Sequence, residues 1–141
     1  MYDKYLVTGA TGFLGRTVVE ELVHHDAQVR ALVLHNDPYI NLLPKEVHTI
    51  VGDVCDKNSL ADFFADADSR TCVIHCAGIV SVASRPGPKL YQVNVGGTWR
   101  ILRQCLAHEV GKLIHVSSVH AIPENQRAAL SRKAVTSPRV L

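Results

Sequence analysis

A glycine-rich stretch near the N-terminus constrains the fold of this chain most strongly. Residues 6–15 read LVTGATGFLG, so Gly9, Gly12 and Gly15 follow an apolar run at G-x-x-G-x-x-G spacing. The segment after them carries apolar residues at helical spacing, which predicts a strand, a tight turn and a helix in succession. This succession is the context in which a glycine turn can bind the diphosphate of a dinucleotide.

Each glycine has a physical role in such a turn. We expect Gly9 to turn the chain sharply off the strand, where a Cβ would clash. Gly12 would let backbone N–H groups approach a pyrophosphate, and Gly15 would let the helix pack closely on the strand. The helix N-terminus would then present unpaired N–H groups and a partial positive charge to the phosphates. These residues alone leave open the alternative of a glycine turn without a ligand.

Composition indicates one ordinary globular domain. The chain has 141 residues, of which 47% are hydrophobic and 20% charged, and its net charge is +2. So small a charge gives no support to a nucleic-acid partner. No apolar run approaches the roughly 20 residues of a membrane span, and the N-terminus lacks the pattern of a secretory signal. We predict a cytoplasmic protein without nucleic-acid or membrane partners.

The cysteines and histidines do not indicate a metal site. Cys55, Cys72, Cys76 and Cys105 form no C-x-x-C pair, and we expect them to be buried free thiols in a reducing compartment. The eight histidines are scattered, without an H-E-x-x-H motif or a cluster of ligands. We therefore predict no metal.

Apolar runs alternate with helical patterns along the chain. Strands are expected at residues 5–7, 29–34, 47–51, 72–76 and 113–116, with a short helix near 40–43, another around 60–64 and a long one over 89–108. On the long helix, Val95, Trp99, Leu102 and Leu106 fall on one apolar stripe with Ile101 and Cys105 beside it, and Gly111 is expected to end it. The alternation predicts an α/β fold, a Rossmann-type doubly wound parallel sheet of order 3-2-1-4-5.

Several polar or glycine-rich segments follow the predicted strands. They are residues 9–15, 33–36, 53, 77–81 and 118. Ligands in doubly wound sheets bind outside the carboxyl ends of the strands. The sequence therefore predicts one ligand crevice to which five separate segments contribute.

Five motifs together resemble the extended short-chain dehydrogenases/reductases, the group that contains the NAD-dependent epimerases and dehydratases. They are TGATGFLG at 8–15, GDVCD at 52–56, HCAG at 75–78, NVGGT at 94–98 and HVSS at 115–118. Their order and spacing match from residue 4 to about residue 123. The resemblance implies an NAD(P)-binding Rossmann domain over residues 1–123 that is incomplete on its C-terminal side.

The resemblance also implies roles for individual residues. Asp53 would bond the adenine amine with Val54 beside the ring, Asn94 would order the site, and Ser118 would be the catalytic residue that holds the substrate oxygen. Two alternatives remain open: Asp53 only caps a turn, and Asn94 bonds locally within its helix. The full set of predicted cofactor-binding residues is Gly9, Gly12, Phe13, Leu14, Gly15, Val33, Leu34, His35, Asp53, Val54, Cys76, Ala77, Gly78 and Asn94.

The choice between NAD and NADP depends on the end of the second strand. NAD-binding proteins often place an acidic residue there, which bonds the ribose hydroxyls. Here the strand ends in Leu34 and His35, and we expect Asp37 to lie too far along the loop. His35 or Arg16 could reach a 2′-phosphate. The predicted cofactor is thus NAD(P), with a lean toward NADP.

The chain departs from the family after Ser118. The family's base is a tyrosine in a Tyr-x-x-x-Lys motif, which exchanges the hydroxyl proton as hydride moves to or from the nicotinamide. Tyrosine occurs here only at positions 2, 5, 39 and 91, so no tyrosine follows Ser118. Residues 124–141 form an atypical basic tail, and we interpret the chain as a truncated or frameshifted product or a fragment of a longer enzyme.

The predicted function is therefore the NAD(P)-binding portion of an epimerase, dehydratase or reductase that acts on a hydroxyl or carbonyl carbon. Without the tyrosine we expect no turnover by this chain alone. The alternative is a non-catalytic dinucleotide-binding or redox-sensing module. The predicted partners are the dinucleotide and a small-molecule substrate.

Overall fold

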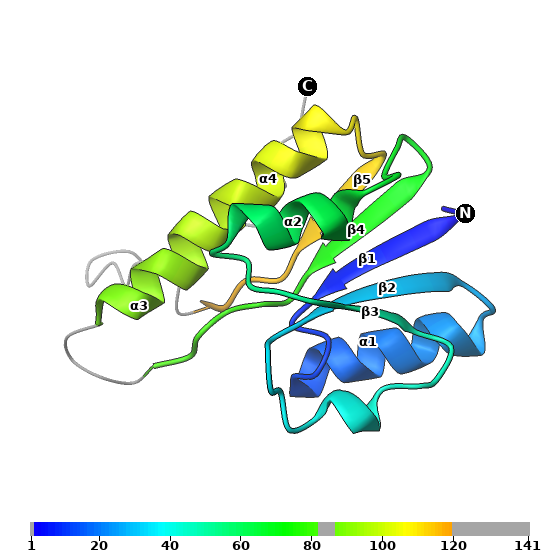
Figure 1. The fold of residues 1–141 in the computed structure, drawn as a ribbon, viewed down its shortest axis with the longest axis horizontal. Coiled ribbons are helices and arrows are strands. Elements are labelled where there is room, and N and C mark those ends of the chain that lie inside the picture. The colour runs from blue at the N-terminus through cyan, green and yellow to red at the C-terminus, as the bar shows by residue number, and fades with distance from the viewer. Residues whose placement is uncertain (1, 82–86, 120–141) are drawn as a thin grey trace, which may run out of the picture.

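The computed structural model describes residues 2–81 and 87–119 (Figure 1). The predicted basic tail at 124–141 lies outside the described residues. The elements in chain order are β1 (Lys4–Thr8), α1 (Phe13–His24), β2 (Gln28–Val33), the 3-10 turn η1 (Ile40–Leu42), β3 (His48–Val51), α2 (Lys57–Phe64), β4 (Thr71–His75), α3 (Pro88–Tyr91), the π-helical stretch η2 (Gln92–Gly97), α4 (Thr98–Ala107) and β5 (Lys112–His115).

The five strands form one parallel sheet in the order β3-β2-β1-β4-β5. This confirms the predicted α/β class and strand order. Val7 of β1 pairs with Ala31 of β2 on one side and Ile74 of β4 on the other, so β1 lies at the centre. Each strand begins and ends within one or two residues of its predicted range.

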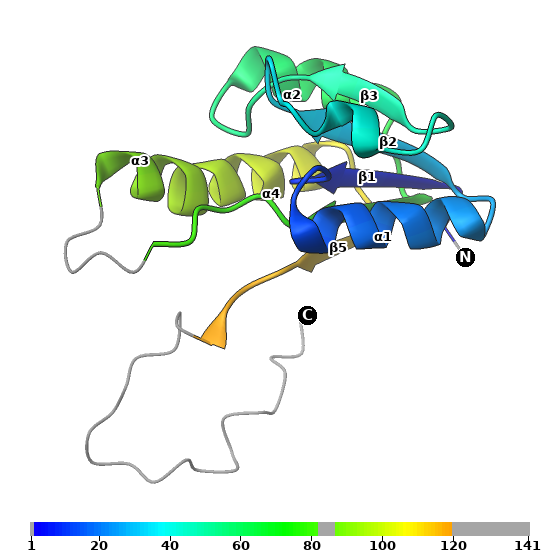
Figure 2. The ribbon, with the colours of Figure 1, turned by 90° about the horizontal axis from the view of Figure 1, so that it is seen from below.

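Helices cover both faces of the sheet, α1 on one face and α2 and α4 on the other (Figures 1 and 2). Successive residues of a strand point to opposite faces, so Leu6 packs with α2 and α4 while Val7 packs with α1. The α2–α4 cluster consists of Leu6, Leu32, Val54, Leu60, Phe63, Phe64, Ala67, Val73, Ile101 and Cys105. The α1 cluster consists of Val7, Ala10, Val19, Val29, Ala31, Val33, Leu43, Val47, Cys72 and Ile74.

The long helix that was expected over residues 89–108 differs from its prediction in two respects. It is a succession of α3, η2 and α4, with a π-helical stretch in its middle. Its buried apolar side chains are Ile101 and Cys105, which pack with α2 and the sheet, whereas Trp99 and Leu106 on the predicted stripe are exposed. Apolar spacing defined the stripe, but contact with α2 on one side and β4 on the other decides which residues are buried.

The end of α4 also differs from its prediction. The helix ends at Ala107, and Glu109 takes the left-handed backbone conformation with φ 52°. The N–H of Val110 then donates to the carbonyl of Cys105 over 2.9 Å. Gly111 lies beyond this turn, where a Cβ would collide with the backbone of Ser69. Close packing of two loops therefore requires Gly111, and Glu109 makes the turn that ends the helix.

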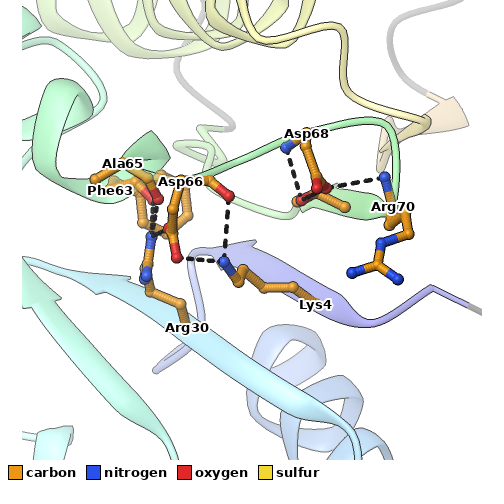
Figure 3. A network of polar contacts seen from close by, with 8 residues as sticks. Lys4, Arg30, Phe63, Ala65, Asp66, Asp68 and Arg70 are labelled. Atoms are coloured by element: carbon orange, nitrogen blue, oxygen red, sulfur yellow. Dashed lines mark hydrogen bonds and ion pairs between the residues drawn. The ribbon is translucent and has the colours of Figure 1, made fainter.

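An ion-pair network ties the segment at the C-terminal end of α2 to the central strand β1 and to its neighbour β2 (Figure 3). Asp66 accepts from Lys4 of β1 at 2.6 Å and pairs with Arg30 of β2 at 3.0 Å. Arg30 also donates to the carbonyls of Phe63 and Ala65. Chiefly through the hydrogen bond from Lys4, the pKa of the Asp66 carboxyl is lowered. Lys4 begins β1, so this network lies away from the carboxyl ends of the strands and its role is structural.

The four cysteines are free thiols. Cys72 and Cys105 are buried as predicted, whereas Cys55 and Cys76 are only half-buried, because both lie in segments that follow strands. Within the described ranges, no helix has the length and apolar character needed to cross a bilayer.

Candidate functional site

A cleft of about 340 Å³ opens at the carboxyl ends of the strands. The segments after β1, β2, β3 and β4 line it together with residues from α3 and η2. The lining residues are Gly9, Thr11, Gly12, Leu32, Leu34, Asp37, Gly52, Asp53, Val54, Cys76, Ala77, Gly78, Ile79, Lys89 and Val93. The structure thus brings four of the five predicted segments together around one cleft.

The glycine turn forms the floor between β1 and α1. Gly9 has φ +66°, and a Cβ there would lie 2.7 Å from the nitrogen of Ala77. A Cβ at Gly15 would collide with the carbonyl oxygen of Gly9, so α1 packs directly on the turn. The helix has no side-chain cap, and the N–H groups of its first turn have no partner within the helix. Such a terminus attracts anions.

Asp37 reaches the cleft, contrary to the expectation that it lies too far along the loop. Asn36 adopts the left-handed conformation with φ 58°, and the N–H of Asp37 donates to the carbonyl of Leu34 at 3.2 Å. This tight turn folds the chain back toward the strand end. The Asp37 carboxylate accepts from the Thr11 hydroxyl at 2.6 Å and from the N–H of Tyr39 at 2.9 Å. An acidic side chain therefore lies next to the glycine turn.

Asp53 lines the cleft after β3. Its Oδ1 accepts from the N–H of Cys55 at 2.8 Å, so the carboxylate does stabilise the local turn. The thiol of Cys55 in turn donates to the carbonyl of Gln92 at 3.4 Å, which links this turn to η2. Burial, and next the charge of Asp53, raise the pKa of the Cys55 thiol. Val54 packs into the core beneath the cleft.

Asn94 holds the opposite wall of the cleft. Its Oδ1 accepts from the N–H of Ile79 at 2.7 Å, and its Nδ2 donates to the carbonyl of Ile79 at 2.8 Å. Both side-chain bonds therefore reach across to the segment after β4, and the alternative of an asparagine side chain that bonds within its own helix is wrong. The neighbouring Cys76 lines the cleft, and burial raises the pKa of its thiol.

Other predicted site residues lie outside the lining of this cleft. Phe13 and His35 are exposed, and Leu14 is half-exposed. Val33 is buried among the residues beneath α1. Ser118 lies three residues beyond the end of β5 and is exposed. Gly15 and Asn94 do not line the cleft but support its lining. Gly15 packs against the Gly9 turn, and Asn94 binds the backbone of Ile79.

Several lining residues were not among the individually predicted cofactor-binding residues. Thr11 and Ile79 lie within predicted crevice segments, whereas Asp37 and Lys89 lie outside them. Thr11 lies between Gly9 and Gly12, and this position within the glycine motif could have indicated that it lines the cleft. Lys89 and Val93 come from a helix that follows the strand end by more than ten residues. Only the three-dimensional course of the chain brings them to the cleft.

Comparison with known proteins identifies the family. The model of the 3-beta hydroxysteroid dehydrogenase/isomerase family matches residues 6–134. The chain belongs to this family. The result confirms the resemblance to the extended short-chain dehydrogenases/reductases.

Relatives and solved structures agree with membership of the 3-beta hydroxysteroid dehydrogenase/isomerase family. Human 3 beta-hydroxysteroid dehydrogenase type 7 is 35% identical over 130 residues, which cover 87% of this chain and 34% of that protein. Sterol demethylase protein B of Methylococcus capsulatus is 30% identical and covers 94% of this chain and 40% of its own length. Thermus thermophilus UDP-glucose 4-epimerase, solved with NAD, has a TM-score of 0.73 and 29% identity over 90% of this chain and 42% of that one. The chain thus spans between a third and about two fifths of the length of these proteins.

Proposed function

We propose that this chain binds the adenosine diphosphate part of NAD in the cleft at the carboxyl ends of its strands. The observation that carries the proposal is the position of the glycine turn and the uncapped start of α1 at the floor of that cleft. The likeness to an epimerase that was solved with NAD supports it. The cleft has the size that a bound organic ligand needs.

The cleft offers a suitable binding group for the diphosphate, the ribose and the adenine of the coenzyme. The N–H groups at the start of α1 would receive the diphosphate, and the carboxylate of Asp37 would accept from the ribose hydroxyls. Asp53 would bond the adenine amine, with Val54 beside the ring. Lys89, also in the lining, would add a positive charge to the part of the cleft near Cys55. When bound, the nicotinamide ring supplies hydride transfer.

We propose NAD rather than NADP as the coenzyme. Two of the lone-pair positions of the Asp37 carboxylate are engaged by Thr11 and Tyr39, which leaves others for ribose hydroxyls. A 2′-phosphate beside this carboxylate would be repelled, since like charges a few ångströms apart repel by several kcal/mol near a protein surface. This proposal replaces the lean toward NADP, which assumed that no acidic group reaches the end of β2.

The proposed reaction of the whole protein is reversible hydride transfer at the hydroxyl-bearing carbon of a sterol-like alcohol. The match to the 3-beta hydroxysteroid dehydrogenase/isomerase family supports this substrate class. Ser118 is proposed to hold the substrate oxygen. Since no tyrosine follows Ser118 in this sequence, we propose that these 141 residues bind the coenzyme without turnover. A purely binding or sensing module would use the same cleft without Ser118, so Ser118→Ala in a full-length relative distinguishes the two functions.

Fluorescence titration with NADH and NADPH tests the proposal. We expect the wild-type chain to bind NADH at least about tenfold more tightly than NADPH, the ratio that a repulsion near 1.4 kcal/mol produces. Asp37→Asn should remove most of this preference. The matched control Thr11→Val removes one hydrogen bond of Asp37 and keeps its charge, and it should keep the preference. Absence of NADH binding by the folded wild-type chain would overturn the proposed function, and equal preferences in wild type and Asp37→Asn would overturn the choice of NAD.

A further inference from the structure

A fully buried histidine lies directly behind the wall of the cleft. His75 is the last residue of β4 and has 1% of its surface exposed. The next residues, 76–79, form the wall. Its Nδ1 lies 2.6 Å from the Thr8 hydroxyl oxygen at the end of β1, and its Nε2 lies 2.9 Å from the Thr98 hydroxyl oxygen at the start of α4. The ring therefore bridges the end of the central strand and the helix that covers it.

The neighbouring hydrogen bonds determine which ring nitrogen carries the proton. The Thr98 hydroxyl donates to the carbonyl oxygen of Asn94 at 2.8 Å. A hydroxyl has one proton, so the Thr98 oxygen must accept the proton of His75 Nε2. Nδ1 of a neutral ring is then an acceptor, and it receives the hydroxyl proton of Thr8. The Thr8 oxygen itself accepts from the N–H of Ala77 at 3.3 Å.

This assignment produces a chain of four hydrogen bonds that all run in one direction, from Ala77 through Thr8, His75 and Thr98 to Asn94. A neutral ring is required, because a charged imidazolium would have a proton on both nitrogens and could not accept from Thr8. The surroundings favour the neutral form, since burial lowers the pKa of His75 to about 4 and the ring of His115, stacked at 5.3 Å, adds to the effect.

Both ends of this hydrogen-bond chain lie at the wall of the cleft. One end is the N–H of Ala77. The other end is Asn94, whose side chain makes both of its bonds to the backbone of Ile79. Asn94 lies in the π-helical stretch η2, and π-helical turns occur frequently at functional sites. Thr98 fixes the backbone carbonyl of Asn94. By holding the backbone of Asn94 in place, this bond also orients the side chain that binds Ile79.

We propose that His75 is a positioning residue of the dinucleotide cleft. As the neutral Nε2–H tautomer, it holds the wall at residues 77–79 through Thr8 at one end and through Thr98 and Asn94 at the other. His75 does not itself line the cleft. The identity of the ligand rests on the proposed function, whereas the hydrogen-bond chain and its effect on the wall do not.

The tautomer can be measured directly on the wild-type chain. Long-range proton–nitrogen correlation spectra of the nitrogen-15-labelled protein distinguish a protonated Nε2 from a protonated Nδ1. We expect His75 to have its proton on Nε2 at neutral pH. A proton on Nδ1, or on both nitrogens, overturns the inference. This measurement needs neither a variant nor a ligand.

A matched pair of variants tests the effect on the wall. Thr98→Val removes the hydroxyl and keeps the branched shape, whereas Thr98→Ser keeps the hydroxyl. In Thr98→Val we expect the amide of Ile79 to exchange with solvent about tenfold faster, as for the loss of one neutral hydrogen bond. The dissociation constant for NADH should rise by about the same factor. Thr98→Ser should stay within about twofold of wild type in both measurements, as should His115→Phe, which keeps a ring beside His75.

The outcomes separate this inference from the proposed function. If the wild-type chain does not bind NADH, the proposed function fails, and the tautomer and the exchange of Ile79 still decide the role of His75. If Thr98→Val speeds exchange equally at Ile79 and throughout the sheet, the bond is merely stabilising and the positioning role is refuted. If Thr98→Val is too unstable to be measured, the tautomer of His75 in the wild-type chain decides whether the inference stands.

Discussion

Mild acid should destabilise this chain through His75. The ring is surrounded by the uncharged hydroxyls of Thr8 on β1 and Thr98 on α4, and by the ring of His115 on β5. Among the described residues, no carboxylate contributes to the shifted pKa of His75, so protonation inside the fold would place a positive charge in a buried site without a described counter-ion. Burial accordingly lowers the pKa of His75 to about 4. The unfolded chain protonates the same residue at its ordinary pKa of about 6.5.

The sign and size of the effect follow from this difference. Between about pH 6.5 and about pH 4 the unfolded state binds the proton and the folded state does not, so acid favours unfolding in this window. With a folded pKa of about 4, linkage predicts a loss of about 2 kcal/mol at about pH 5 relative to about pH 8. The full shift corresponds to about 3 kcal/mol at lower pH. The lowered pKa values of Asp56 and Asp66 act only below about pH 4, outside this window.

Urea unfolding at about pH 8, 6 and 5 measures this loss in the wild-type chain and in two variants. His75→Asn has nothing to protonate at this position, so we expect its stability to change by about 2 kcal/mol less than that of wild type between about pH 8 and about pH 5. His115→Asn removes the exposed partner of the stacked pair and should retain most of the wild-type dependence. The comparison uses differences with pH, so the constant cost of each substitution cancels. Equal pH dependence in wild type and His75→Asn would refute the reasoning.

Three further outcomes are expected. Gly15→Ala should lower the free energy of unfolding in urea by more than about 3 kcal/mol, because its Cβ would collide with the Gly9 backbone. Gly78→Ala should lower it by less than about 1 kcal/mol, because its Cβ would lie 3.5 Å from the Asn94 side chain. Similar losses in the two variants would contradict the packing of α1 on the turn. Asp66→Asn should lower the free energy of unfolding by about 1 kcal/mol or less, and this loss should shrink in about 1 M salt, because the Asp66 side chain is 62% exposed. A salt-independent loss of several kcal/mol would argue against a surface ion pair. Burial raises the pKa of the Cys105 thiol to about 11, so Cys105 should react with a thiol reagent at about pH 8 only as fast as the chain unfolds, and rapid labelling of folded protein would contradict its burial.

Local features of the sequence were sufficient to predict the framework. The apolar runs and the glycine turn after β1 predict the five strands and their order, because right-handed crossovers leave few ways to arrange alternating strands and helices. Gly9 and Gly15 could be assigned roles for a related reason. Each meets a backbone group within the same turn or in the adjacent strand end, and strand, turn and helix together determine that geometry.

Features that depend on the path of loops could not be predicted in the same way. The expectation that Asp37 is too distant treats the loop as extended, and the left-handed Asn36 shortens that path. Similarly, the apolar stripe of the long helix did not identify its buried face. Trp99 and Leu106 follow the helical period as well as Ile101 and Cys105 do, but of these four residues only Ile101 and Cys105 are buried in the α2–α4 cluster.

The hydrogen-bond chain through His75 connects the glycine turn to the wall of the cleft at residues 77–79. Gly9 approaches Ala77 so closely that no Cβ fits between them, and the residue before Gly9, Thr8, accepts the N–H of that same Ala77. The ends of β1 and β4 are thus joined by a backbone contact and by a side-chain bond at adjacent positions. Through His75 and Thr98 the connection continues to Asn94 and returns to the wall at Ile79. A displacement of β4 by a fraction of an ångström would lengthen several of these bonds at once, so the cleft is expected to be largely formed before any ligand arrives, and little binding energy is then spent on ordering it.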